Sequence, residues 1–235
     1  MSTVVIDPHG NLHIVVLVQE RLQSKNGTVL GLKDRATFQV SSKALIQTCE
    51  AFKAAFHPER PSGTYWGHIT FVDRDQIELK EESIASLEIC LRVAHNQVPE
   101  TDVSLTDVWY VLAMFDKYGA SLDSLNYWFA QWFDRQSITD WLLNFIEKPV
   151  RGQVIDMNRN PRALLYPTWR FGHVKGFKRV TCFLAYNISA HITEQSPIKR
   201  DDPASQQVSF LEHHLSGRII RELTAEISSS GLVFH

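Results

Sequence analysis

The chain of 235 residues is long enough for one large domain or two small ones, and it can bury a core without disulfides or a metal. With 44% hydrophobic and 21% charged residues it is typical of an ordinary globular protein, which excludes a disordered, collagenous or repetitive chain. Its 24 basic and 26 acidic residues nearly balance, so we expect binding to neither nucleic acid nor a membrane, and any charged patch is local.

The start of the chain lacks the features of a membrane or secreted protein. Its longest apolar run there, residues 14–18, is far shorter than the roughly 18 residues of a spanning helix. No basic stretch opens it as in a signal peptide, so we expect an intracellular protein, cytoplasmic or nuclear. Cys49, Cys90 and Cys182 form no CxxC pair, which predicts neither a disulfide framework nor a zinc ribbon.

The first 80 residues have the pattern of a β-sheet. The predicted strands are residues 12–18, residues 36–40, residues 69–72 and a last strand that contains Ile77 and Leu79. Residues 19–35 are expected to form a loop, with an Asn-Gly pair typical of a tight reversal at its tip, residues 24–27, although residues 28–32 could add a short strand. We expect the whole sheet within residues 1–80.

The remaining segments have helical periodicity. One helix is predicted over residues 41–56, with Ser41 or Ser42 as its N-cap. Further helices are predicted over residues 82–95, 104–118, 121–134, 137–147, 161–171, 174–191 and 209–228. Pro167 is expected to kink or break its helix. Residues 151–160 are polar and are expected to form a linker.

The helical periodicity also predicts a core. Six apolar side chains are expected to be nearly fully buried in one cluster: Phe52, Phe56, Leu87, Leu91, Leu112 and Phe115. The helices between residues 104 and 147 contain more aromatic residues than the single core-facing side of each helix can accommodate. Part of them is therefore expected to pack on the C-terminal helices or on a partner.

This order of a strand pair, a helix, a strand and three helices resembles a BTB/POZ domain. The resemblance is carried by Asp7-Pro8-His9-Gly10-Asn11-Leu12, by Val40-Ser41-Ser42-Lys43, by a helix that ends near His95, and by Phe115-Asp116-Lys117-Tyr118. It is similar to the fungal branch of the family and covers residues 7–134. Residues 164–172 and 177–181 resemble, more loosely, the helical extension of such fungal proteins. The resemblance implies an α+β BTB/POZ domain at 7–134 and an all-helical segment at 135–235, with the boundary between 134 and 160.

The resemblance further implies a non-catalytic protein-interaction scaffold. Family members commonly dimerise through the first strand and first helix, and the matching residues are Leu12, Ile14, Val16, Leu45 and Ile46. Asn11 stands where many animal members carry Asp, so the geometry of a homodimer is left open. The binding partner is expected to be a protein of unknown identity.

Two alternatives remain. Val98-Pro99-Glu100 has the hydrophobic-x-Glu form found in cullin-binding BTB proteins, which implies a substrate adaptor of a cullin-RING ubiquitin ligase, although an ordinary acidic loop explains the same residues. The other alternative is an enzyme with a cleft between the core and the extension.

The sequence gives little support for catalysis. It contains no GxG, no GxxxxGK[ST] and no GxSxG pattern, so we expect no nucleotide cofactor and no hydrolase elbow. His9 and His13 lack further ligands for zinc, and His213 and His214 point about 100° apart on a helix. We therefore expect no catalytic residue, cofactor or metal.

Overall fold

The computed structural model describes residues 3–24, 27–56, 65–66, 69–80, 82–99, 102–135 and 161–187. They divide into two compact units. The first unit contains Met1–Glu100 and Ala113–Ser121, and the second contains Thr101–Leu112 and Leu122–His235. This division differs from the predicted domains of 7–134 and 135–235, because residues 101–112 and 122–135 cluster with the later helices. The boundary predicted between 134 and 160 falls mostly outside the described residues and stays a prediction.

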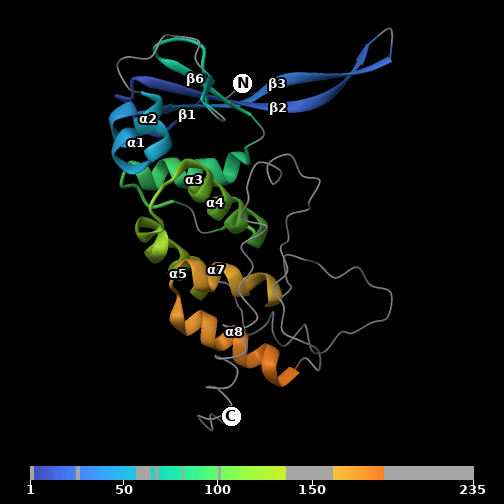
Figure 1. Ribbon diagram of the computed structural model, residues 1–235, viewed down its shortest axis with the longest axis vertical. Helices are drawn as coiled ribbons and strands as arrows, with labels where there is room; N and C mark the ends of the chain where they lie inside the picture. Colours follow the sequence, from blue (N-terminus) through green and yellow to red (C-terminus); the bar gives the residue numbers. More distant parts are fainter. Residues whose placement is uncertain are drawn as a thin grey trace. The chain divides into compact units, whose positions relative to one another are not determined.

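The first unit contains a mixed sheet of six strands, which makes the chain an α+β protein (Figure 1). The strands are β1 (Thr3–Val5), β2 (Leu12–Ser24), β3 (Gly27–Val40), β4 (Tyr65–Trp66), β5 (Ile69–Phe71) and β6 (Gln76–Lys80). Their order is β1-β3-β2-β6-β5-β4. β1 runs parallel to β3 and β6 runs parallel to β2, whereas the other neighbours are antiparallel. All described strands lie within residues 3–80, as predicted, although β1 and β4 were not expected.

The expected loop at residues 19–35 is wrong, because these residues continue the β2–β3 hairpin. Gln19 pairs with Leu32, and the register runs on to Ser24 opposite Gly27. Residues 25 and 26, at the tip of the predicted reversal, lie outside the described residues. β6 pairs with β2 only between His13 and Leu17, so the far part of the hairpin extends past the rest of the sheet (Figure 1). The alternative strand at residues 28–32 is confirmed as part of β3. Pairing between backbone groups does not depend on apolar side chains, so the polar composition of residues 19–23 and 33–35 concealed the rest of the two strands.

A short turn joins β1 to β2 and contains part of the family-like motif. The Asp7 carboxylate accepts the His9 backbone N–H at 2.9 Å, and the Gly10 N–H donates to the Asp7 carbonyl at 2.9 Å. A Cβ atom at Gly10 would lie 2.5 Å from the Val40 carbonyl group, so this position requires glycine. The motif residues thus have structural roles.

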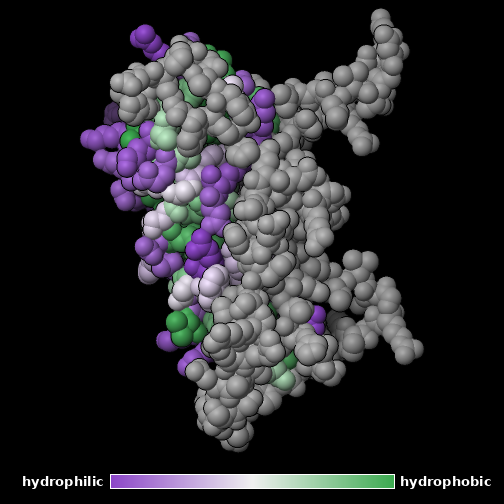
Figure 2. Space-filling view, viewed as in Figure 1, coloured by the Kyte–Doolittle hydropathy of each residue, from purple (hydrophilic) through white to green (hydrophobic). Residues whose placement is uncertain are grey.

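The predicted helix over 41–56 is two helices, α1 (Ser42–Thr48) and α2 (Glu50–Ala55). Cys49 between them is extended, with φ −132° and ψ 119°, and forms an isolated β-bridge with Ala120. The positive φ of 63° at Gly119 turns the chain so that its carbonyl accepts the Glu50 N–H. This contact with a residue 69 positions away replaces one helical turn, so local periodicity could not predict the break. Figure 2 shows that the outer side of α1 and α2 is largely hydrophilic.

The helices α3 (Ile84–Ala94) and α4 (Leu105–Tyr118) are confirmed, with serine caps. The Ser83 hydroxyl accepts the Ser86 N–H at 3.4 Å, and Ser104 and Asp107 cap each other reciprocally. α4 begins in the second unit and ends in the first.

The core of the first unit lies between the sheet and α1, α2 and α3. Its residues are Ile6, Leu12, Ile14, Val16, Ala36, Phe38, Val40, Leu45, Ala51, Phe52, Ala55, Ile69, Ile77, Leu79, Leu87, Leu91, Met114 and Tyr118. Phe52, Leu87 and Leu91 are buried there as predicted. The expectation is wrong for Phe56, which is only partly buried, because it lies at the end of α2. Leu112 and Phe115 are buried but lie outside this cluster, to which α4 contributes Met114 and Tyr118 instead.

The described regular elements of the second unit are all helices. After α4 it contains the 3₁₀ helix η1 (Leu122–Leu125), α5 (Asn126–Arg135), the 3₁₀ helix η3 (Pro161–Leu164), α7 (Leu165–Arg170) and α8 (Val174–Asn187). The helices predicted over 137–147 and 209–228 and the linker at 151–160 lie outside the described residues. Pro167 does not break α7, because it is the third residue of that helix, where its missing N–H has no partner to lose. The transition from 3₁₀ to α-helix comes earlier, at Leu164.

Aromatic side chains form the core of the second unit. Trp109 donates its indole N–H to the Ala163 carbonyl at 2.8 Å and stacks on Tyr166. Phe129 stacks on Phe171, with 4.4 Å between the ring centroids. The expectation that part of the aromatic surplus packs on C-terminal helices is therefore confirmed for these residues. Among the described residues no helix is long and apolar enough to cross a membrane.

Candidate interaction site at the α3–α4 loop

The loop from α3 to α4 begins with a fixed backbone geometry. Asn96 adopts a left-handed conformation, with φ 55°, directly after the last turn of α3. The Gln97 N–H donates to the Arg92 carbonyl at 2.8 Å, and the Asn96 N–H donates to the Val93 carbonyl at 2.9 Å. These two bonds form the helix-ending motif in which asparagine tolerates a positive φ. The chain therefore leaves α3 in a defined direction.

Side chains anchor the start of this loop to the N-terminal segment. The Gln97 amide donates to the Ile6 carbonyl at 2.6 Å, and its oxygen accepts a bond from Arg92 at 3.1 Å. Arg92 is itself held by Glu88, 2.6 Å away on the previous turn of α3. Sequence reasoning missed this anchor, because Ile6 and Gln97 are 91 residues apart.

Val98 follows the anchor and is exposed. Its side chain is 75% accessible to solvent, whereas the next residue, Pro99, is buried. An apolar side chain held outward between the anchored Gln97 and the buried Pro99 loses little conformational freedom when a partner covers it. Burying a valine contributes about 1.5 kcal/mol to an interface. Of the candidate residues Val98, Pro99 and Glu100, the structure thus exposes Val98, and Glu100 lies outside the described residues.

The candidate dimer residues are mostly inside the chain. Leu12, Ile14, Val16 and Leu45 are at most 1% exposed and belong to the core, and only Ile46 is half-buried. Four of the five residues that the resemblance implies for a dimer surface are therefore buried within the chain itself. Alternate residues of a strand face the same side, and in β2 that side is covered by the chain's own helices. A homodimer stays a prediction, and light scattering at micromolar concentration would decide it.

The family-like motif at the start of α1 is used for helix capping. The Asn11 Oδ1 atom accepts the Ser42 backbone N–H at 3.0 Å and the Ser42 hydroxyl at 3.1 Å. The Ser41 N–H donates to Nε2 of His95 at 2.9 Å, and Nδ1 of His95 lies 2.7 Å from the Leu91 carbonyl. This arrangement requires the His95 tautomer with its proton on Nδ1. These side chains join α1 to β2 and α3, although Ser41 itself makes no side-chain cap.

A buried polar cluster lies near the end of α4. The side chains of Lys117 and Glu82 are only 3% and 4% exposed and form an ion pair. The Tyr118 hydroxyl donates to the same Glu82 carboxylate at 2.7 Å. Burial and the adjacent carboxylate raise the pKa of Tyr118 well above its ordinary value. The sequence pointed to Lys117 and Tyr118 through the D-K-Y ending, but nothing in it indicated Glu82.

The thiols are unsuited to nucleophilic chemistry. Burial raises the pKa of Cys49 to about 11 and also raises the pKa of Cys90 well above its ordinary value. Because the thiolate is the reactive form, both groups are weak nucleophiles at neutral pH. Within the described residues no group of three His, Cys, Asp or Glu side chains could hold a metal ion.

The loop thus presents one exposed apolar side chain, Val98, beside an anchored residue. The polar side chains of Asn11, His95 and Glu82 form hydrogen bonds within the fold. Comparison with models of protein families, with curated proteins and with solved structures finds no match to the chain in any of the three. The BTB/POZ resemblance therefore rests on the residues described above and remains a proposal.

Proposed function

We propose that the chain is a non-catalytic protein-interaction module of the BTB/POZ type. The order of its elements supports this assignment, since the β2–β3 hairpin, α1 and α2, the parallel strand β6 and then α3, α4 and α5 follow the plan that the resemblance implies. The proposed interaction is supported by the exposure of the Val98 side chain. Val98 lies on a loop that a hydrogen bond from Gln97 fixes to the N-terminal segment.

The use of the polar groups supports a role without catalysis. Asn11 and His95 cap helix α1, and Glu82 is bonded to Lys117 and Tyr118. A catalytic acid or base needs a functional atom within reach of a substrate, whereas the Glu82 carboxylate is buried. These polar side chains therefore have structural roles, and the exposed Val98 side chain is the candidate for recognising a partner.

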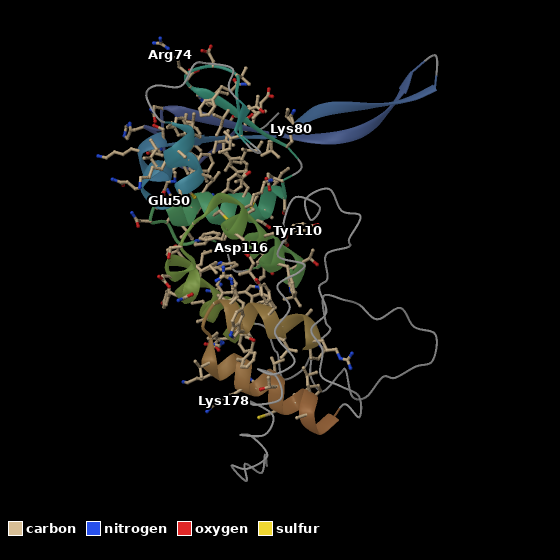
Figure 3. The ribbon with its side chains drawn as sticks, viewed as in Figure 1. Glu50, Arg74, Lys80, Tyr110, Asp116 and Lys178 are labelled. Carbon is tan, nitrogen blue, oxygen red and sulfur yellow. The ribbon has the colours of Figure 1, made fainter. Side chains whose placement is uncertain are left out.

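Affinity capture with the full chain tests this proposal. The wild-type chain, Val98→Asp and Val72→Asp are tagged in the same way, and captured proteins are quantified by mass spectrometry. Val72 is a matched control, because it is 50% exposed and lies beside the β5–β6 turn, where Arg74 points outward (Figure 3). A partner should be captured by the wild type and by Val72→Asp, and should be lost with Val98→Asp.

Two results would contradict the proposal. The first is a wild-type chain that enriches no protein above an unrelated tagged chain. The second is a partner that Val98→Asp retains as well as the wild type does, with both variants folded by circular dichroism. In that case the α3–α4 loop is not the contact.

The second candidate function is a substrate adaptor of a cullin-RING ubiquitin ligase, which the exposure of Val98 in the hydrophobic-x-Glu segment favours. Titration calorimetry with a panel of purified cullin N-terminal domains tests it directly. One cullin should bind the wild type, and Val98→Asp and Glu100→Ala should each weaken binding. If no cullin binds the folded chain, the adaptor function fails while the broader interaction function stands.

A further inference from the structure

The end of β1 is held to the sheet by one residue of β3. The Gln39 carbonyl accepts both the Ile6 N–H at 3.0 Å and the Asp7 N–H at 3.1 Å. The Gln39 side-chain amide also donates to the Gly10 carbonyl at 3.1 Å. Ile6 is 2% exposed and belongs to the core of the first unit. Ile6 therefore attaches the end of β1 both to β3 and to the core.

The pairing of β1 with β3 is short. It extends from Thr3 opposite Thr37 to Val5 opposite Gln39, whereas β2 pairs with β3 along its whole length. β1 also lies at one edge of the described sheet, its pairing is parallel, and Thr3 and Val5 are exposed. A short parallel pairing at an edge is less stable than the centre of a sheet. β1 can therefore open locally while the rest of the first unit stays folded.

Ile6 links β1 to the loop that presents Val98. Its N–H donates to Gln39 and its carbonyl accepts the Gln97 side-chain amide, so consecutive hydrogen bonds join β3 to the residue before Val98. If β1 detaches, the Gln97 amide loses its acceptor. The loop then keeps only the contact of Gln97 with Arg92 and the backbone bonds at the end of α3. An element with two states that biases a second site couples the two energetically.

We propose that β1 regulates the α3–α4 loop. While β1 is paired with β3 the loop holds Val98 in its binding conformation, and when β1 detaches this conformation is lost. The inference rests on the proposed function for the role of Val98, whereas the coupling between β1 and the loop requires no partner. Because coupling is reciprocal, a weaker anchor at Gln97 also loosens the end of β1.

Hydrogen exchange of the free full chain, resolved by NMR for each amide, tests the coupling from the side of β1. Alternate residues of an edge strand direct their N–H groups at the neighbouring strand, so Val4 shares the orientation of Ile6 and the Val5 N–H points away. Val4→Pro should therefore weaken the pairing of β1, and Val5→Pro is its matched control. The Asn96 and Gln97 amides should exchange at least about threefold faster with Val4→Pro. With Val5→Pro they should stay within about twofold of the wild type.

Gln97→Glu tests the coupling from the side of the loop. A glutamate at this position still accepts the bond from Arg92 but cannot donate to the Ile6 carbonyl. The Ile6 and Asp7 amides should exchange about fivefold faster, which corresponds to the loss of one hydrogen bond. The matched control Gln47→Glu adds the same charge at an exposed position of α1 and should change these rates by less than about twofold. Amides of α4 should keep their wild-type rates in every variant.

Three exchange results would overturn the inference. The first is faster exchange at Ile6 and Asp7 with Val4→Pro and no change at Asn96 and Gln97, because β1 would then detach independently of the loop. The second is an equal effect of Gln97→Glu and its control. The third is a matching acceleration along α4, because the variants would then act through general stability.

Affinity capture tests the regulation of the site. Val4→Pro should capture at least about threefold less of the protein that Val98→Asp loses, and Val5→Pro should capture as much as the wild type. Equal capture by the two proline variants would overturn the regulatory role of β1. The predicted exchange rates in a chain that captures no protein would instead refute the proposed function and leave the coupling in place.

Discussion

Tyr118 and Glu82 are joined by a hydrogen bond of 2.7 Å inside the first unit, where Lys117 contacts the same carboxylate oxygen. The three groups satisfy one another, so a buried negative charge and a buried positive charge are compatible with the core. This cluster fixes the end of α4 to the residue that precedes the Ser83 cap of α3.

Removing Glu82 should destabilise the chain strongly. Glu82→Ala leaves the Lys117 ammonium buried without its partner, and we expect a loss of about 3–5 kcal/mol in the free energy of unfolding. Tyr118→Phe removes one hydrogen bond and should cost about 1–2 kcal/mol. Urea denaturation measures both. Glu50→Ala is the control, because the Glu50–Lys53 pair is 75% and 61% exposed and should contribute less than about 1 kcal/mol. A loss for Glu82→Ala no larger than for this control would refute the role of the cluster.

Asn11 should act through its oxygen atom as a cap of α1. Asn11→Ala removes the acceptor of the Ser42 N–H and should cost about 1 kcal/mol in urea denaturation. Asn11→Asp keeps an acceptor and adds a negative charge at the helix N-terminus, so its stability should equal or exceed that of the wild type. An aspartate variant as unstable as the alanine variant would show that the acceptor oxygen at position 11 does not stabilise α1, and an alanine variant as stable as the wild type would show that the cap contributes nothing.

The cysteines should react slowly in the folded chain. Burial raises the pKa of Cys49 to about 11 and raises the pKa values of Cys90 and Cys182. At about pH 8 few of these groups are thiolates, so a disulfide reagent such as Ellman's should modify them slowly. In a denaturant all three cysteines should react rapidly. Rapid modification of Cys49 in the folded chain would contradict the burial of its thiol.

His173 should make the second unit sensitive to acid. Its Nδ1 atom is buried without a hydrogen-bond partner, and its ring lies 4.8 Å from that of Phe133. Burial lowers the pKa of His173 below 6.5, with Lys175 acting in the same direction and the Asp134 carboxylate opposing it. Well above pH 6.5 both folded and unfolded states are neutral at this residue. Below that value the unfolded state binds the proton first, so stability falls until the folded pKa is passed.

Thermal unfolding at a series of pH values measures this effect. His173→Phe keeps an aromatic ring between the helices and removes the titrating group. Its stability should therefore fall less than that of the wild type as the pH decreases below 6.5. Parallel pH profiles for the two proteins would exclude His173 as the source of acid sensitivity.

The sequence could predict those helices and strands whose buried residues recur at regular intervals. β5, β6, α3, α4 and α8 have an apolar stripe of period two or 3.6 and clear end signals, and the structure confirms them. The aromatic excess likewise predicted packing on later helices, as Phe129 on Phe171 confirms.

Long-range contacts explain what local patterns missed. The break at Cys49 depends on Gly119 and Ala120, and the anchored loop at Gln97 depends on Ile6. Leu45 could be an exposed dimer residue or a core residue by pattern alone, because periodicity identifies an apolar face but not what covers it. For the candidate site, the sequence indicated Val98 through a three-residue motif, and only the structure showed that Gln97 is anchored and Pro99 is buried beside it.

Hydrogen exchange of the chain with and without its captured partner is the most direct test of interaction through the α3–α4 loop. Backbone amides of Asn96, Gln97 and Val98 should exchange more slowly in the complex, because the partner covers this segment. Amides of α1 and α2, whose outer side is hydrophilic, should exchange at unchanged rates. Protection that leaves the α3–α4 loop unchanged and appears elsewhere in the chain would contradict the proposed site.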